Sequence, residues 1–264
     1  MPLAPKVLVG GTEIKRAYLG TTLLFDRTSP PLAQIEEIAQ VAAVFAADPA
    51  YLFQDTAATT PVTAGGQSVG AWQDTSGLYT LTRVGSGVTY QESGGLSWIE
   101  SDGNGRLQGP VSDDWTPNLM LAVAATAEGS GHTRPMTLAD ATRTSDQHNL
   151  QLTDDGKSGI RDRDFVPDPA IDCWTTFTTT TSKPYVINAV IDASINRARA
   201  RINGSADQEA NTSGSSQVVG IYTGETTDEL CFCGEGGNTP ETTANKVFAG
   251  VVGVGIPVAA DRDL

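Results

Sequence analysis

Two acidic residues in the segment WIESDGNG, Glu100 and Asp102, have a spacing that could support glycoside hydrolysis. Side chains two positions apart on a strand point to one face, so a general acid and a nucleophile could share a cleft. The E-x-D-x-x-E pattern of such enzymes is incomplete here, because position 105 is Gly. Asp102 also begins an Asp-Gly turn. We therefore expect solvated carboxylates at a strand end.

A serine in the segment Gly66–Gly70 matches the pattern G-x-S-x-G of a nucleophile elbow. That elbow requires a strand, a sharp turn and then a helix, and the residues after Ser68 lack a helical pattern. The two histidines, His132 and His148, lie far along the chain in loop-like sequence. We therefore expect that the chain is not an enzyme.

Three arginines at a period of two, Arg197, Arg199 and Arg201, suggest binding rather than catalysis. On a strand they share one face, and small or apolar residues occupy the other. Arginine binds carboxylate and sulfate in a bidentate way, so the row could recognise an anionic glycan or an acidic partner. The alternative is a polar outer face whose arginines pair with acidic residues of neighbouring strands.

A sugar-binding site usually needs an exposed aromatic ring that stacks on the sugar. Trp115 lies in the loop-like sequence SDDWTP and is the best stacking candidate. Trp72 and Trp98 have strand-like neighbours and are expected in the core, and Trp174 is expected to be half buried.

No metal or cofactor site is complete in the sequence. Calcium needs several converging oxygens. Several pairs of oxygen-bearing side chains could contribute to a calcium site, although none has the spacing of an EF-hand loop. Cys231 and Cys233 would share one face of a strand, a poor geometry for a disulfide, so we expect buried, reduced thiols. We assign no metal and no cofactor. The acidic pairs are Asp102 with Asn104, Asp113 with Asp114, Asp154 with Asp155, and Asp162 with Asp164.

The chain is acidic: 17 Lys and Arg against 31 Asp and Glu give 17 − 31 = −14 over 264 residues. This balance argues against binding to nucleic acid or to anionic lipid, which both need a basic surface. No apolar run approaches the ~18 residues of a membrane span. No secretory signal is recognisable at the N-terminus, so we expect synthesis and folding in a cytoplasm.

Three parts follow one another along the chain. Residues 1–28 show short β-like segments between glycine turns, too few strands to be stable without a partner. Residues 29–49 show apolar residues at spacings of three and four, which predicts a connecting helix. This helix would either pack against its own domain or join subunits of an oligomer. Residues 50–264 show β patterning.

The third part predicts a mainly β fold, an antiparallel sandwich. Asp-Gly and Asn-Gly pairs typical of hairpins recur along it, and no helical pattern appears. The clearest strands predicted are 118–126, 184–191, 196–202, 217–222 and 246–256.

Two stretches of this part resemble a known family. The segment YLFQDTAATTPVTAGGQSVGAWQDTSG, Tyr51–Gly77, resembles the opening of a concanavalin A-like (laminin-G-like) jelly-roll domain found in bacteriophage virion proteins. The segments YVINAVIDASINRARARINGSAD, VVGIYTG and VFAGVVGVGI resemble its second half. After Gly77 the chain departs from the family pattern, with Leu78-Tyr79-Thr80. The front segment VGGTEIKRAYLGTTLLFD resembles N-terminal segments of phage tail proteins.

The resemblance implies a phage virion structural protein, located in the virion and made in the bacterial cytoplasm. Residues 1–28 would anchor it to other virion proteins of a tail fibre, a baseplate or a capsid. The sandwich would then project outward, either to decorate the particle or to bind host-surface glycans. On family grounds we expect a homo-oligomer, a trimer. The alternatives are a free carbohydrate-binding module or lectin and, less favoured, a glycan hydrolase.

Overall fold

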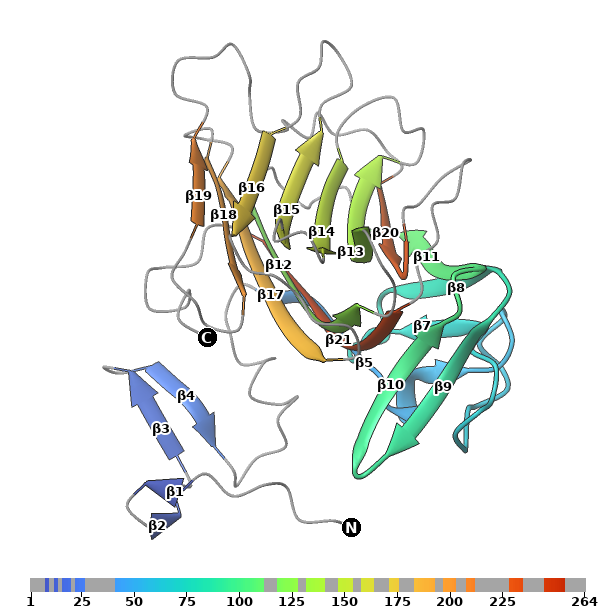
Figure 1. Ribbon diagram of the computed structural model, residues 1–264. Coiled ribbons are helices and arrows are strands. Elements are labelled where there is room, and N and C mark those ends of the chain that lie inside the picture. The colour runs from blue at the N-terminus through green and yellow to red at the C-terminus, as the bar shows by residue number, and fades with distance from the viewer. Residues whose placement is uncertain are drawn as a thin grey trace.

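Two large antiparallel sheets face each other in the computed structural model (Figure 1). They form the sandwich that the sequence predicts. The structure describes residues 8–9, 12–13, 16–19, 22–26, 41–111, 118–127, 132–140, 147–153, 158–163, 171–175, 183–192, 197–202, 208–211, 228–234 and 245–254.

The back sheet has eight strands in the order β19-β18-β17-β12-β21-β10-β9, and β5 also pairs with β21. The first strand of the sandwich thus lies beside the last one. The bounds are β5 Val41–Ala46, β9 Val88–Ser93, β10 Leu96–Ser101, β12 Asn118–Ala127, β17 Pro184–Asp192, β18 Arg197–Ile202, β19 Gln208–Asn211 and β21 Asn245–Val254.

The front sheet has nine strands in the order β16-β15-β14-β13-β20-β11-β8-β7-β6. In Figure 1 its strands β13–β16 lie in front of β12, β17 and β18 of the back sheet. The bounds are β6 Leu52–Phe53, β7 Ala71–Gln73, β8 Thr80–Gly85, β11 Gly105–Pro110, β13 His132–Asp140, β14 Gln147–Thr153, β15 Ser158–Arg163, β16 Ile171–Thr175 and β20 Asp228–Phe232.

Four of the five strands named from the sequence are confirmed, as β12, β17, β18 and β21. The fifth, 217–222, lies outside the described residues. Alternation places every second residue of these strands in the core, as Ile187, Ala200 and Val247 illustrate. This regularity is why period-two patterns in the sequence located the strands well.

The predicted helix is wrong over its second half. Residues 29–40 lie outside the described residues, but Val41–Ala46 forms strand β5, paired with β21. The run VAAVFA is apolar throughout, so helical spacing and strand alternation fit it equally well. Ala43 and Phe45 point into the core, and pairing with β21 satisfies the strand's backbone groups. Asp48 caps the short 3-10 turn η1, Pro49–Tyr51.

An aromatic cluster joins the two sheets at the centre of the core. Phe232 of the front sheet packs against Trp72 and Phe45, with ring centroids 4.8 and 5.5 Å away. The indole Nε1 of Trp72 donates a 2.8 Å hydrogen bond to the carbonyl of Ala46. Gly250 of the back sheet lies against Phe232, where an added Cβ would come within 2.3 Å of the ring. The two sheets are therefore closely packed here.

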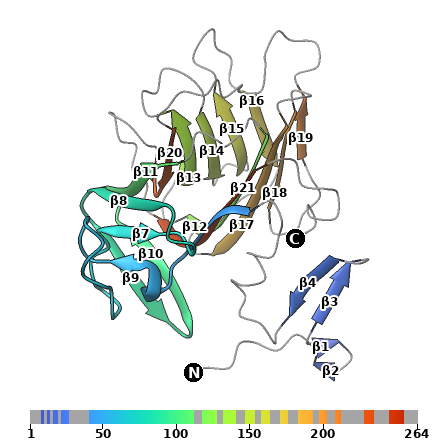
Figure 2. The ribbon, with the colours of Figure 1, turned by 180° about the vertical axis from the view of Figure 1, so that it is seen from behind.

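The predicted N-terminal β unit consists of two hairpins, β1 Leu8–Val9 with β2 Thr12–Glu13 and β3 Arg16–Leu19 with β4 Thr22–Asp26. Among the described strands these four pair only with one another. Both views show them outside the two large sheets (Figures 1 and 2). Within the described part of the chain, no helix is long and apolar enough to span a membrane.

Candidate functional site

The residues that carry the family resemblance build the loops of the front sheet. Asp74 is 1% exposed, and its carboxylate accepts hydrogen bonds from the Ser76 hydroxyl at 2.5 Å and the Tyr79 amide at 2.9 Å. The W-x-D-x-S-G segment is thus a turn closed by its own side chains, next to the buried Trp72. Its role is architectural.

Asp55 closes the preceding loop in the same way. Its carboxylate accepts hydrogen bonds from the amides of Ala57, Thr59 and Thr60, at 3.0, 3.2 and 2.7 Å. These bonds lower the pKa of Asp55 to about 2, with the Thr60 interaction the largest cause. Gly70 packs against this loop, and a Cβ at Gly70 would come within 2.5 Å of the Asp55 backbone. The interactions of Asp55 and Gly70 therefore stabilise the conformation of the loop.

Neither catalytic pattern of the sequence, the G-x-S-x-G motif at Ser68 or the carboxylate pair Glu100 and Asp102, has the geometry that its reaction requires. Ser68 forms an isolated bridge with Thr89, and its hydroxyl accepts a hydrogen bond from Arg83. A strand-turn-helix elbow is absent from this fully described stretch. Asp102 accepts a 2.9 Å hydrogen bond from the Asn104 amide within the expected Asp-Gly turn, whereas Glu100 lies on the outer face of β10.

A row of polar residues crosses the outer face of the front sheet. Cross-strand pairing links one residue on each of seven strands: β8, β11, β20, β13, β14, β15 and β16. On β8, β11, β20 and β13 the neighbours of these residues in the chain, such as Leu107 and Phe232, are core residues, so the row's members on these four strands face away from the core. We call it the front row: Thr82, Gln108, Cys231, Thr137, Asn149, Arg161 and Asp172.

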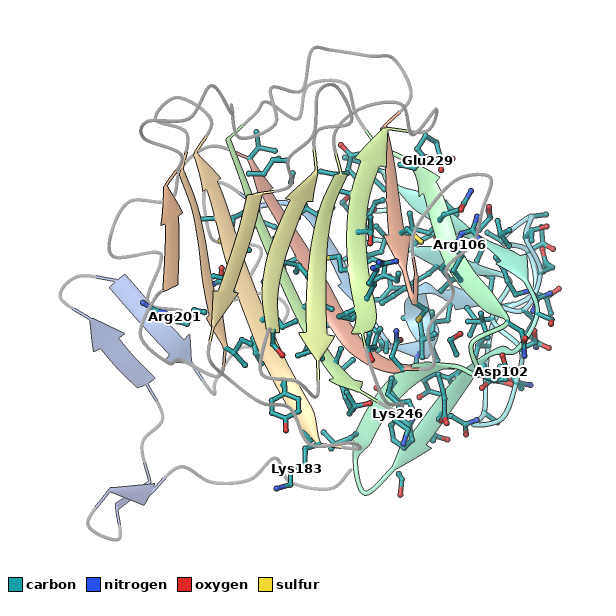
Figure 3. All side chains as sticks on the ribbon, turned by 45° about the horizontal axis from the view of Figure 1, so that its top comes forward. Asp102, Arg106, Lys183, Arg201, Glu229 and Lys246 are labelled. Carbon is teal, nitrogen blue, oxygen red and sulfur yellow. The ribbon has the colours of Figure 1, made fainter. Side chains whose placement is uncertain are left out.

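The front row changes from open to enclosed along its length. Thr82 and Gln108 are half exposed, whereas Cys231 and Thr137 are 0% exposed. Arg106, beside Gln108 on the same face, is only 2% exposed and donates a 2.6 Å hydrogen bond from Nε to the Gln108 side-chain oxygen. Figure 3 shows Arg106 on the same side of the molecule as Glu229. A buried arginine held by an amide is unusual on an outer sheet face.

Further residues of types suited to a polar ligand lie on strands β14 to β16 of the same sheet. Pairing places Trp174 opposite Gly159, and Arg163 opposite Gln147. Trp174 and Arg163 each lie two residues along their strand from a member of the front row. An arginine fork, amides, hydroxyls and a tryptophan are the groups that bind sugars. Local sequence patterns do not reveal this site, because its members are scattered along the chain from residue 82 to residue 231. Only the register unites them.

The two described thiols do not add reactive chemistry to the face. Cys231 and Cys233 are both free and buried, as predicted. Burial raises the pKa of the Cys233 thiol far above its usual range, so it stays protonated and is a poor nucleophile and metal ligand. Among the described side chains no group of three or more His, Cys, Asp or Glu could hold a metal ion.

The arginines singled out in the sequence lie on the back sheet, not on the front face. Pairing places Arg197 opposite Asp192, Arg199 opposite Glu209, and Arg201 opposite Asn188. Two of the three thus have a carboxylate residue as cross-strand neighbour, which is what the alternative of a paired polar face expects. Figure 3 shows Arg201 at the far side of the molecule from Arg106. Trp115 lies outside the described residues.

The prediction for Trp72 is confirmed, whereas that for Trp98 is wrong. Trp72 is wholly buried, but Trp98 is half exposed on the outer face of β10. The next residue, Ile99, takes the core position instead. The alternation could have shown this, because Trp98 has the same parity as the charged Glu100.

Several solved structures share this fold. Domain 4 of AbnA, a GH43 extracellular arabinanase from Geobacillus stearothermophilus in complex with arabinotriose, has a TM-score of 0.58 at 14% identity, covering 86% of this chain and 100% of that chain. A Trypanosoma rangeli sialidase in complex with a difluoro-KDN compound has a TM-score of 0.55 at 12% identity, covering 86% of this chain and 32% of the sialidase chain.

The binding domain of botulinum neurotoxin serotype D has a TM-score of 0.50 at 11% identity, covering 84% of this chain and 50% of that chain. No family model matches the sequence, and no curated protein matches it. At these identities the likeness establishes the fold, an antiparallel β-sandwich of the jelly-roll type. It gives no link to a phage particle.

Proposed function

We propose that this chain is a carbohydrate-binding module that holds its ligand on the outer face of the front sheet. One observation carries the proposal: the front row places hydrogen-bonding residues side by side on seven strands. Its fold likeness to a domain solved with arabinotriose adds support.

The chemistry of the row suits a sugar better than a protein partner. Gln108 and Thr82 offer donors and acceptors at the open end, and Arg106 behind them is held in place by Gln108. Fixed polar groups of this kind recognise hydroxyls without a large apolar contact. Strand β16 also carries Trp174, an aromatic residue of the kind that stacks on sugars. We expect binding without hydrolysis, which a reducing-sugar assay on the bound glycan would check.

A glycan array with neutral and acidic oligosaccharides tests the proposal. The unchanged chain should bind one or more glycans, and Gln108→Ala should weaken that signal. Asn188→Ala is the matched control, because it removes a half-exposed amide side chain from the outer face of the back sheet. Absence of any glycan signal, or equal loss in both variants, would refute the proposal.

The finer proposal is display of this module on a phage virion, for which the family resemblance of Tyr51–Gly77 and the hairpins of residues 8–26 are the support. Each hairpin pairs only within itself among the described strands, which suits an element that docks on a partner. Mass spectrometry of purified virions should find the chain in many copies. A chain without residues 1–28 should fold and fail to incorporate.

A further inference from the structure

A second cluster of chemically suited side chains lies on the opposite sheet. Trp98 and Glu100 of β10 and Lys246 and Phe248 of β21 form what we call the Trp98 cluster. The indole Nε1 of Trp98 donates a 3.0 Å hydrogen bond to Glu100 Oε2. Lys246 Nζ lies 5.8 Å from the centroid of the indole ring, and the Phe248 ring lies 6.1 Å from it at 50°.

All four side chains are half exposed and point away from the core, since Ile99 and Val247 occupy the inward positions between them. Glu100 and Lys246 are direct cross-strand partners in the antiparallel pair β10–β21. Figure 3 shows Lys246 at the β10 end of the molecule, away from Arg201 at the β18 end. The cluster therefore has a defined place on the outer face of the back sheet.

This combination is unlike an ordinary solvent-exposed sheet face. The rings of Trp98 and Phe248 are half-buried and contact each other, so their outer edges offer apolar surface to a ligand. The carboxylate and the ammonium beside them are opposite in charge and close together, so the cluster carries little net charge. It offers an apolar surface with one strong acceptor and one strong donor at its border.

We propose that the Trp98 cluster is a second binding site, specific for a neutral hexopyranose ring. The C–H face of the sugar packs on the indole and on Phe248, while its hydroxyls donate to Glu100 and accept from Lys246. The cluster has no net positive charge to hold a sugar carboxylate, so acidic sugars are disfavoured here. The proposal does not depend on the front row, because the two sites lie on different sheets. A chain with both would hold two glycan branches at once and gain avidity.

The test is fluorine NMR of the full chain labelled with 5-fluorotryptophan. The signals of Trp72, Trp98 and Trp174 are assigned by their loss in single Trp→Phe variants. Trp98 reports on the back-sheet cluster, Trp174 on the front sheet, where it belongs to strand β16, and the wholly buried Trp72 on the fold. The probes are methyl glucoside, methyl galactoside, arabinotriose and sialyllactose, each added in increasing amounts.

A neutral hexopyranoside should shift the Trp98 signal in a saturable way while Trp72 stays unchanged. Glu100→Gln should weaken that response at least severalfold. Leu96→Ala, which removes a 61% exposed side chain two residues away on the same strand face, should leave the response unchanged. The Trp98 response should also persist in Gln108→Ala, which alters only the front row.

Two results would overturn the inference: no Trp98 shift with either hexopyranoside, or a stronger shift with sialyllactose than with the neutral sugars. The two proposals fail separately in this experiment. A shift of Trp174 alone leaves the front face as the binding site and refutes the second one. A shift of Trp98 alone supports the Trp98 cluster as a binding site and refutes the front face.

Discussion

The two outer faces of the sandwich differ, although the same alternation builds both. The front face carries polar residues in register across seven strands, several of them enclosed. The middle of the back face is apolar apart from Asn188: Val186 pairs with Ala124, which pairs with Ala249, and Ala122 pairs with Val251. The aromatic and charged Trp98 cluster lies at one end of the back sheet and the arginine strand β18 towards the other.

The difference lies in how polar residues are arranged on an outer sheet face. An outer face that only meets water needs scattered polar residues, and their register is unimportant. The front row instead lines up across strands that are far apart in sequence, and its centre is removed from water. Burying polar side chains costs free energy unless they are hydrogen-bonded, so such a row is expected where recognition requires it.

The largest expected effect comes from the core that supports both faces. Phe232→Ala removes the ring that contacts Trp72, Phe45 and Gly250, and should cost about 3–5 kcal/mol in the free energy of unfolding. Urea denaturation followed by tryptophan fluorescence measures it. Both faces should lose ligand binding together as the protein unfolds. Loss of only one would show that the sheets are less coupled than the packing indicates.

The loops that carry the family motif should matter for stability and not for binding. Asp74→Ala leaves the Ser76 hydroxyl and the Tyr79 amide without their acceptor and should cost about 1–3 kcal/mol. Thermal unfolding measures the loss. Glycan affinity at a temperature where the variant is folded should be unchanged. A selective loss of affinity would place this loop in the binding site.

A smaller effect separates the two faces directly. Gln108→Ala removes one half-exposed hydrogen-bonding group of the front row and should weaken glycan binding about tenfold, the equivalent of roughly 1.4 kcal/mol. Calorimetric titration with the best array glycan gives the number. Because Gln108 also accepts the hydrogen bond of the buried Arg106, the free energy of unfolding should fall by about 1–3 kcal/mol, so the titration is run at a temperature where the variant is folded. Equal affinity of the variant and the unchanged chain would remove Gln108 from the site.

The smallest effect concerns pH and the Asp55 loop, which lies outside both faces. Its pKa is lowered from 3.8 to about 2 by hydrogen bonds of the folded loop. A carboxyl with a lowered folded pKa stabilises the fold above its unfolded pKa, and that contribution disappears as pH falls from about 4 to about 2. Asp55→Asn should therefore flatten the stability curve in this window. An unchanged acid limb would contradict the assignment.

The sequence predicted the architecture well and the site poorly, for one physical reason. Period-two patterns are local, so strands such as Pro184–Asp192 and Arg197–Ile202 were located almost to the residue. Pairing between strands is not local, however. Gln108, Cys231 and Asn149 become neighbours in the front row only through the register of three separate strand pairs.

Two local errors have the same origin in ambiguous apolar runs. In VAAVFA every position is apolar, so the pattern could not separate a helix from β5. In Leu96–Ser101 the adjacent Trp98 and Ile99 are both apolar, and only one of them can face the core. The smaller Ile99 fills the interior and leaves the tryptophan outside. Which residue goes inward depends on the opposite sheet, and a single strand does not encode it.

The most direct test of the central claim exchanges the same residue type on the two faces. Arg161 belongs to the front row and Arg201 to β18 of the back sheet, so Arg161→Ala and Arg201→Ala differ in place and not in chemistry. Both are titrated with the best array glycan. The front row as the binding face predicts that Arg161→Ala loses affinity while Arg201→Ala keeps it. The opposite result would contradict this account and return the site to the back-sheet arginines.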